Sequence, residues 1–174
     1  MLSFEAAWNN LLDQIEQKGW AWQYVHADDG AGGYEPFPFY CYTVGLAAKG
    51  LPDLIVVGLN PRVATDAGDE IISRALQAGG QPFTLNTVLL DVFKNSRAML
   101  VEVPKEHAAN RSLFALDFAE ATSRPLQVFQ LLWPDQGGRL PFEDGADAAF
   151  VEVPPVLKHL PLPDPVQPDS PAMQ

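Results

Sequence analysis

The residue types best suited to nucleophilic or metal chemistry are sparse in this chain. Cys41 is its single cysteine, and the histidines stand apart as His26, His107 and His159. A nucleophilic thiol needs a histidine beside it, oriented by a carboxylate, and a zinc site needs several Cys or His ligands at short spacings. Cys41 instead lies between two tyrosines, in a setting typical of a packed core thiol. We therefore predict a structural role for Cys41, and neither a resident metal nor a cofactor.

Two glycine-containing segments are candidates for phosphate binding. The run from Gly30 to Gly33 lacks the Lys and the Ser or Thr of a phosphate-binding loop, and no helix start follows it. The segment from Gly58 to Pro61 is better placed, because it joins a predicted strand to a predicted helix whose first N–H groups are free. Arg62 adds a positive charge there. A plain strand-to-helix connection explains the same residues.

A tightly specified corner follows the last predicted strand. Trp133, Pro134 and Asp135 precede a Gly-Gly pair, and Asp in such a turn accepts backbone N–H groups. Arg139 is placed to pair with Asp135 across the turn. One interpretation is a turn lock. The other is a ligand site, in which the corner faces a cleft shared with an upstream strand; its candidate residues are Tyr42, Thr43, Trp133, Asp135 and Arg139.

Aromatic residues are dense in the first quarter of the chain. Two neighbouring strands that pack into one core explain this density, and an aromatic-lined pocket for a planar ligand is the alternative. The residues concerned are Trp20, Trp22, Tyr24, Tyr34, Phe37, Phe39, Tyr40 and Tyr42. Lys and Arg are not interleaved with these rings, which argues against stacking on nucleic acid.

Three ordered sequence blocks resemble a known bacterial family. They are Gly19-Trp20, Tyr42 to Leu46 followed by Pro52-Asp53, and Gln130 to Asp135 followed by Arg139 and Pro141. Together they resemble the family called domain of unknown function 4262, over about residues 15 to 146. Relatives often have His where this chain has Lys18, Glu where it has Asp53, and Trp where it has Phe142. The resemblance implies a domain boundary and carries no activity.

Periodicity and turn residues predict an α+β domain, because strands and helices mix without a regular strand–helix–strand repeat. The expected sheet is mixed or antiparallel and is flanked by two or three helices. Helices are predicted over residues 3–17, 60–78 and 107–122, with Gly68 weakening the second by about 1 kcal/mol relative to Ala. Strands are predicted over Trp20–His26, Phe37–Leu46, Leu54–Leu59, Phe83–Phe93, Arg97–Val103 and Leu126–Trp133. Residues 1–152 form the predicted domain, and residues 153–174 form a Pro-rich tail that is extended or disordered.

The charge of the chain guides the choice of partners. The 174 residues carry a net charge of −11, which disfavours nucleic acid and anionic membranes. No apolar run approaches the roughly 20 residues of a membrane span, and we expect a cytoplasmic protein. The leading hypothesis is an interaction module that docks a basic protein, such as an immunity protein that neutralises a toxin. The alternative is a small-ligand-binding protein or enzyme with a pocket between Tyr42-Thr43 and the Trp133-Pro134-Asp135 corner. The sequence leaves enzymatic activity and oligomeric state open.

Overall fold

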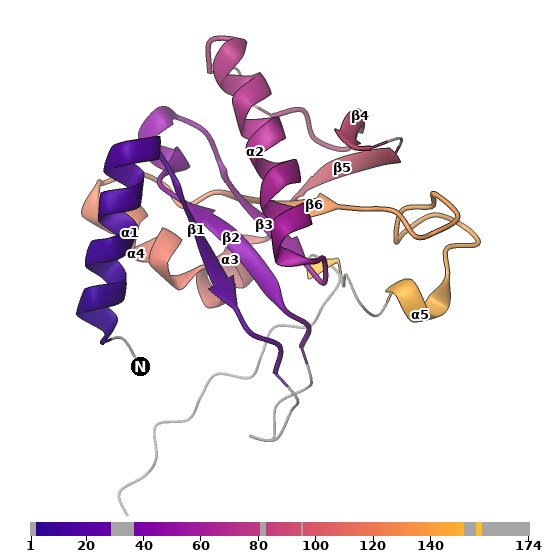
Figure 1. The fold of residues 1–174 in the computed structure, drawn as a ribbon, viewed down its shortest axis with the longest axis horizontal. Helices are drawn as coiled ribbons and strands as arrows, with labels where there is room; N and C mark the ends of the chain where they lie inside the picture. The colour runs from indigo at the N-terminus through magenta and orange to yellow at the C-terminus, as the bar shows by residue number, and fades with distance from the viewer. Residues whose placement is uncertain (1–2, 29–36, 81–82, 95, 152–155, 158–174) are drawn as a thin grey trace, which may run out of the picture.

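A six-stranded mixed β-sheet organises the chain (Figure 1). The computed structural model describes residues 3–28, 37–80, 83–94, 96–151 and 156–157. The strands follow the spatial order β1-β2-β3-β6-β5-β4. Their bounds are β1 Ala21–Val25, β2 Tyr40–Val44, β3 Asp53–Val57, β4 Val88–Phe93, β5 Ser96–Glu102 and β6 Val128–Leu132. The central pair β3–β6 is parallel and the other four pairs are antiparallel, which confirms the predicted α+β class with a mixed sheet.

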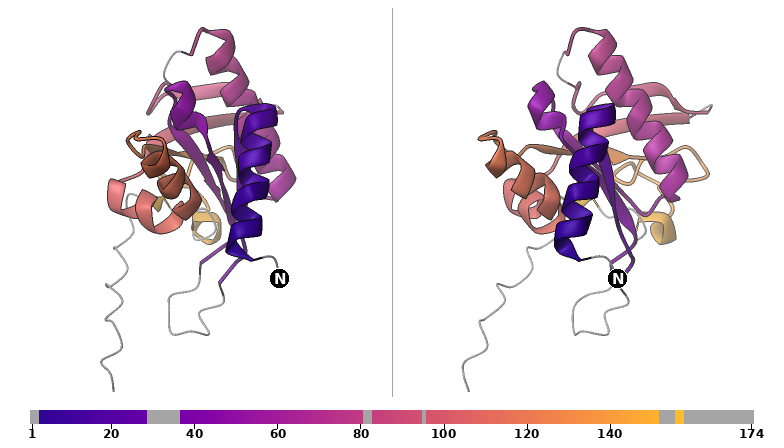
Figure 2. Two further views of the ribbon diagram at one scale, coloured as in Figure 1. Left: turned by 90° about the vertical axis from the view of Figure 1, so that its left-hand side faces the viewer. Right: turned by 60° about the vertical axis from the view of Figure 1, so that its left-hand side comes forward.

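Helices cover both faces of this sheet, as Figure 2 shows from two directions. Helix α2 (Pro61–Gln77) packs on one face, against buried side chains of β1, β2, β3, β5 and β6. On the other face, one core joins α1 (Phe4–Lys18), α3 (Lys105–Arg111) and α4 (Leu113–Ala121) to the sheet. A 3-10 helix η1 (Leu46–Lys49) and a short helix α5 (Ala148–Val151) complete the described elements. Strands β3 and β6 are buried along their whole length, as expected for strands covered on both faces.

The ends of the first two helices agree with their capping residues. The Ser3 hydroxyl accepts a hydrogen bond from the Ala6 N–H at 3.2 Å, and α1 ends at Gly19, whose φ of 97° is in the left-handed region. The Asn60 side chain accepts from the Arg62 N–H at 3.0 Å, and Pro61 is the first residue of α2. These boundaries were predicted from the sequence and are confirmed.

Gly68, in the middle of α2, is explained by the packing of an indole ring. A Cβ at this position would lie 2.4 Å from Cζ2 and 2.5 Å from Cη2 of Trp22. No real Cβ approaches a ring so closely, and the ring cannot swing away like the end of a lysine. The glycine that weakens the helix therefore lets β1 approach α2 closely.

Side chains of β2 alternate between the two cores. Cys41 faces α2 and is fully buried, whereas Tyr40 and Tyr42 face α1 and α4. Burial raises the pKa of the Cys41 thiol to about 12, so the thiol is protonated and unreactive at neutral pH. The prediction of a core thiol is confirmed. The aromatic-rich segment supplies both cores, in line with the packing interpretation.

Three predicted elements differ from the structure. The helix expected over residues 107–122 is divided into α3 and α4, because Ser112 has a ψ of 56° and breaks the helical turn. The strand expected from Phe83 begins only at Val88, after Asn86 with a φ of 54°. The strand expected over Phe37–Leu46 is shorter, because Gly45 turns the chain into η1 with a φ of 110°.

Two described residues of the predicted tail contact the domain. Val156 and Leu157 are buried, and the Leu157 N–H donates to the side-chain oxygen of Gln130 at 2.9 Å. Gln130 is itself fully buried on the central strand β6. The rest of the predicted tail lies outside the described residues, so the boundary at residue 152 stays a prediction.

Candidate functional site

Tyr42 and Thr43 point to opposite faces of β2, since successive strand side chains alternate. Tyr42 lies in the core beneath α4, and its hydroxyl accepts a hydrogen bond from the Phe114 N–H at 3.3 Å. The Thr43 hydroxyl donates to the Asp53 carboxylate at 2.8 Å and accepts from the Leu54 N–H at 2.8 Å. Each side chain is therefore engaged in holding the fold, on a different side of the sheet.

Trp133 lies at the far end of β3 from Thr43. Its indole N–H donates to the Val57 carbonyl at 3.0 Å, whereas Thr43 contacts Asp53. Asp53 and Val57 are the two ends of β3, about 13 Å apart at the usual rise along a strand. The parallel β3–β6 pairing places the corner at the end of β3, so the structure does not bring the five predicted residues into one pocket.

Asp135 holds the turn that follows β6. Its carboxylate accepts hydrogen bonds from the backbone N–H groups of Arg139 at 2.9 Å and Asp147 at 3.0 Å. These bonds lower the pKa of Asp135. The guanidinium of Arg139 donates to the Gly145 carbonyl at 3.1 Å, so Arg139 contacts Asp135 through its backbone and not through the expected side-chain pair. This geometry favours the turn-lock interpretation of the corner.

Asp53 is a buried carboxylate that the sequence marked only as part of a family block. Only 2% of its surface is exposed, and it accepts hydrogen bonds from Thr43 and from the Leu46 N–H. Burial raises its pKa to about 7, against the opposing effect of these two donors. Asp53 and its partners join β2, β3 and η1, which argues for a structural role.

A second carboxylate ties β1 to α2. One oxygen of Asp69 accepts from the indole N–H groups of both Trp20 and Trp22, each at 2.9 Å. Its other oxygen pairs with Lys18, whose ammonium lies 4.8 Å from the centre of the Trp20 ring. Although burial opposes it, the pKa of Asp69 is lowered by these donors. Both carboxylate oxygens of Asp69 therefore have partners within the chain, which favours a structural role in holding β1 against α2.

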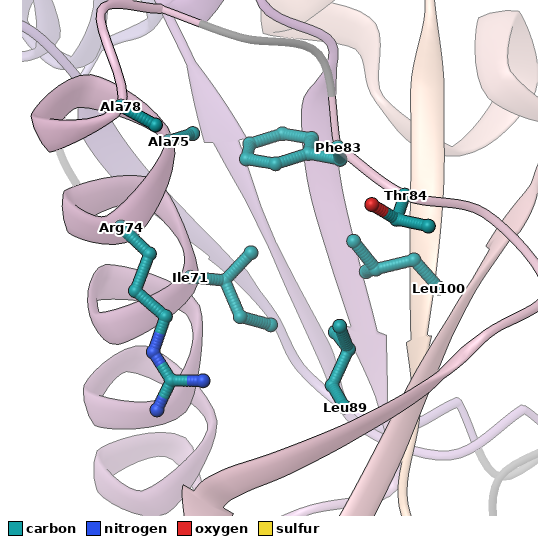
Figure 3. A pocket seen from close by; sticks show the side chains of 8 residues that line it. All are labelled: Ile71, Arg74, Ala75, Ala78, Phe83, Thr84, Leu89 and Leu100. Carbon is teal, nitrogen blue, oxygen red and sulfur yellow. The ribbon is translucent and has the colours of Figure 1, made fainter.

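A pocket opens between α2 and the strands β4 and β5 (Figure 3). Its volume is about 240 Å³. Figure 3 shows the side chains of Ile71, Phe83, Leu89 and Leu100 converging on it. The full lining is Ile71, Arg74, Ala75, Ala78, Phe83, Thr84, Leu89 and Leu100. The floor is apolar, and Arg74 and Thr84 supply the polar groups.

Arg74 fixes one wall of the pocket through backbone carbonyls. Its Nη1 and Nη2 donate to the carbonyls of Leu90 and Asp91 at 2.8 and 2.9 Å. Its Nε donates to Glu70 at 2.8 Å, one helical turn earlier. Asp91 has a φ of 60°, and the β4–β5 register shifts between Leu90 and Phe93. The guanidinium thus secures a bulge in the edge strand β4 against α2.

Residues 14–147 match the family model described as Domain of unknown function (DUF4262). The chain belongs to this family. No curated protein and no solved structure matches it.

The sequence blocks that indicated the DUF4262 family lie at joints of the fold. Gly19 ends α1 and Trp20 contacts Asp69. Thr43 binds Asp53 between β2 and β3. The corner after β6 is closed by Asp135. In this member of the family, the three blocks position secondary structure elements, and the pocket lies apart from them.

Sequence reasoning about this DUF4262 domain missed the pocket for an identifiable reason. The pocket combines residues of α2 with residues of β4 and β5, and no short motif links them. The available signal was the apolar face of α2, where Ile71 and Ala75 recur at helical spacing. None of the described helices is long and apolar enough to cross a membrane.

Proposed function

We propose that this DUF4262 protein binds a small, mainly apolar molecule in the pocket between α2, β4 and β5. The observation that carries the proposal is the convergence of apolar side chains from three elements around an open volume of about 240 Å³. Ligand sites are typically concave, largely apolar and equipped with a few polar groups. This proposal moves the ligand site from the corner at Trp133 to the side of the sheet where α2 packs against β4 and β5.

The volume limits the size of the ligand. An apolar cavity of about 150 Å³ is large enough for benzene. The pocket, at about 240 Å³, therefore suits a single substituted aromatic ring or a short aliphatic chain.

Two polar groups at the wall set the chemistry of the ligand head. Arg74 directs one N–H from each of its three nitrogens to Glu70, Leu90 and Asp91. A guanidinium has five N–H donors, so two remain for a ligand. The Thr84 hydroxyl also lines the pocket. A ring or chain with one hydrogen-bond acceptor, such as a phenol or a short-chain acid, matches this arrangement.

The test is a titration of the full chain with p-cresol, indole and hexanoate, followed by NMR of the methyl groups. We expect saturable shifts at Ile71, Leu89 and Leu100. Ala78→Phe places a ring at the pocket wall and should abolish them. Ala121→Phe, at the exposed end of α4, is the matched control and should leave binding unchanged. Shifts that survive in Ala78→Phe, or that no probe produces, would refute the proposal.

A second proposal rests on charge. The chain has 22 acidic and 11 basic residues, and such a surface complements a basic protein partner. As an alternative function, we propose that the protein docks a basic protein partner in the bacterial cytoplasm, a compartment that suits a single buried thiol. Native mass spectrometry of the protein isolated from its host tests both ideas. A basic protein adduct released by salt supports docking, and a stoichiometric small-molecule adduct supports the pocket.

A further inference from the structure

Arg111, the last residue of α3, is held between two aromatic side chains. Its guanidinium carbon lies 3.6 Å from the centre of the Phe37 ring. The Tyr40 hydroxyl lies near this guanidinium and acts on it electrostatically. The side chain is partly buried, and this burial lowers its pKa despite the neighbouring tyrosine. One face of the guanidinium is therefore fixed in place before any ligand arrives.

The charge of Arg111 has no carboxylate partner within the described part of the chain. The other guanidinium groups that are held in place behave differently. Arg74 pairs with Glu70 and Arg97 with Glu143, and Arg139 is hydrogen-bonded to a carbonyl. Because acidic residues outnumber basic ones 22 to 11, a carboxylate partner would be easy to supply. A partly buried cation is stable when it is paired, so the missing partner suggests an external anion.

The residue after Arg111 provides a second, independent observation. Ser112 is the N-cap of α4, yet its side chain makes no capping hydrogen bond. Its hydroxyl is fully buried and has no hydrogen-bond partner among the described residues. Buried hydroxyl groups in native proteins almost always find a partner. An orphaned hydroxyl at the start of a nine-residue helix lies where anions bind favourably.

Tyr40 and Tyr42 connect these two features. Their rings stack with centroids 6.3 Å apart on the same face of β2. Tyr40 lies near Arg111, and the Tyr42 hydroxyl accepts a hydrogen bond from the Phe114 N–H in the first turn of α4. Asp117, further along α4, acts electrostatically on Tyr42 but makes no ion pair with Arg111 among the described residues. Arg111 and the first turn of α4 thus lie beside one pair of rings, and Ser112 joins the two in sequence.

We propose that Arg111, Ser112 and the N-terminus of α4 bind an oxyanion, the carboxylate or phosphate group of a ligand. The planar fork of arginine matches either group with two parallel hydrogen bonds. Phe37 and Tyr40 hold the fork, and the Ser112 hydroxyl supplies a further donor. The site lies on the α3–α4 face of the sheet, opposite the pocket at α2, and does not depend on the function proposed there.

The test titrates the ¹⁵N-labelled full chain with inorganic phosphate and, separately, with succinate. We expect saturable shifts of the Leu113 and Phe114 amides and of the Arg111 side chain. Preference for phosphate identifies a phosphate ligand, and preference for succinate identifies a carboxylate. Arg111→Gln should weaken binding at least tenfold, and Arg111→Lys should weaken it too, because a lysine lacks the fork. Arg124→Gln, at an exposed arginine after α4, is the matched control.

Two further variants separate binding from folding. Ser112→Ala should raise the melting temperature of the free protein, since it removes an unsatisfied buried hydroxyl, and should at the same time weaken anion binding. Tyr40→Phe keeps the ring and removes the hydroxyl near Arg111, and it should weaken binding several-fold even if Arg111→Gln fails to fold. The proposal is overturned if neither anion gives saturable shifts. It is also overturned if Arg124→Gln weakens binding as much as Arg111→Gln, or if both Ser112→Ala and Tyr40→Phe bind like the wild type.

Discussion

Replacing Gly68 by alanine should destabilise this protein, although the same change stabilises most exposed helix interiors. Helix propensity alone favours Ala by about 1 kcal/mol. The new methyl group, however, would lie 2.4 Å from Cζ2 of Trp22. Such overpacking costs about 1–3 kcal/mol in a close-packed core. The indole N–H of Trp22 also donates to Asp69 at 2.9 Å, and moving the ring weakens a bond to a charged group, at roughly 1 kcal/mol for partial loss.

These opposing effects give a net destabilisation of about 2 kcal/mol for Gly68→Ala. In a domain of this size, that change lowers the melting temperature by roughly 4–8 °C. Urea unfolding followed by far-ultraviolet circular dichroism measures it without relying on Trp22 fluorescence. The free energy of unfolding should fall while the denaturant dependence stays unchanged, because the native surface is the same.

The variant Trp22→Phe supplies the decisive control, because phenylalanine lacks the outer indole ring that meets the new Cβ. In that background Gly68→Ala should become stabilising by about 1 kcal/mol, the propensity gain alone. The coupling energy between the two sites is then about 3 kcal/mol, at the upper end for residues in contact. If Gly68→Ala stabilises the wild type, or has the same effect in both backgrounds, the packing argument is wrong.

Three other predictions test the buried and turn-forming polar groups. Asp53, with a folded pKa raised to about 7, keeps its proton in the folded state after the unfolded state has lost it. Its contribution to the free energy of unfolding is therefore full below about pH 4, and up to about 4 kcal/mol of it is lost as the pH rises to 7. In Asp53→Asn, the free energy of unfolding measured in urea should change less with pH over this range. An unchanged pH dependence would contradict the assignment. Asp135→Asn should lower the free energy of unfolding, because it weakens the hydrogen bonds that close the turn, and should leave probe binding at the α2 pocket intact. Lost binding without lost stability would restore the corner as a ligand site. Cys41, with its thiol pKa raised to about 12, should resist iodoacetamide at pH 8 until urea unfolds the chain; rapid labelling of the folded protein would show an accessible thiolate.

Local chemistry predicted those elements whose ends are marked by side chains. Ser3, Gly19, Asn60 and Pro61 each satisfy or terminate backbone hydrogen bonds within one turn of themselves. Such signals act over four residues and need no tertiary context. The buried run at β3 was equally clear, because a strand covered on both faces is apolar throughout.

The division of the helix at Ser112 has no comparable local signal. Neither Gly nor Pro occurs between residues 107 and 122, and apolar residues continue at helical spacing. The break is stabilised from outside, where the Tyr42 hydroxyl accepts the Phe114 N–H across 72 positions of sequence. Tertiary contacts override propensity at such a point. The pocket was not predictable for a similar reason. Arg74 holds β4 through the backbone carbonyls of Leu90 and Asp91, and because every residue has a carbonyl, such bonds cannot be recognised from residue types.

Net charge is an incomplete guide to partners, because it ignores where each charge lies. A charge of −11 suggested a basic partner, yet the geometry at Arg111 favours an anion. The two ideas predict opposite salt effects on association. Electrostatic range falls from about 30 Å at 0.01 M salt to about 8 Å at 0.15 M, so added salt removes the distant repulsion and leaves the contact with Arg111 nearly intact. The association rate of phosphate, from NMR line shapes, should therefore rise over this range, and that of a basic peptide should fall. If phosphate association instead slows as the peptide's does, phosphate meets an attractive field on approach, and the premise that the net charge of the chain repels it is wrong.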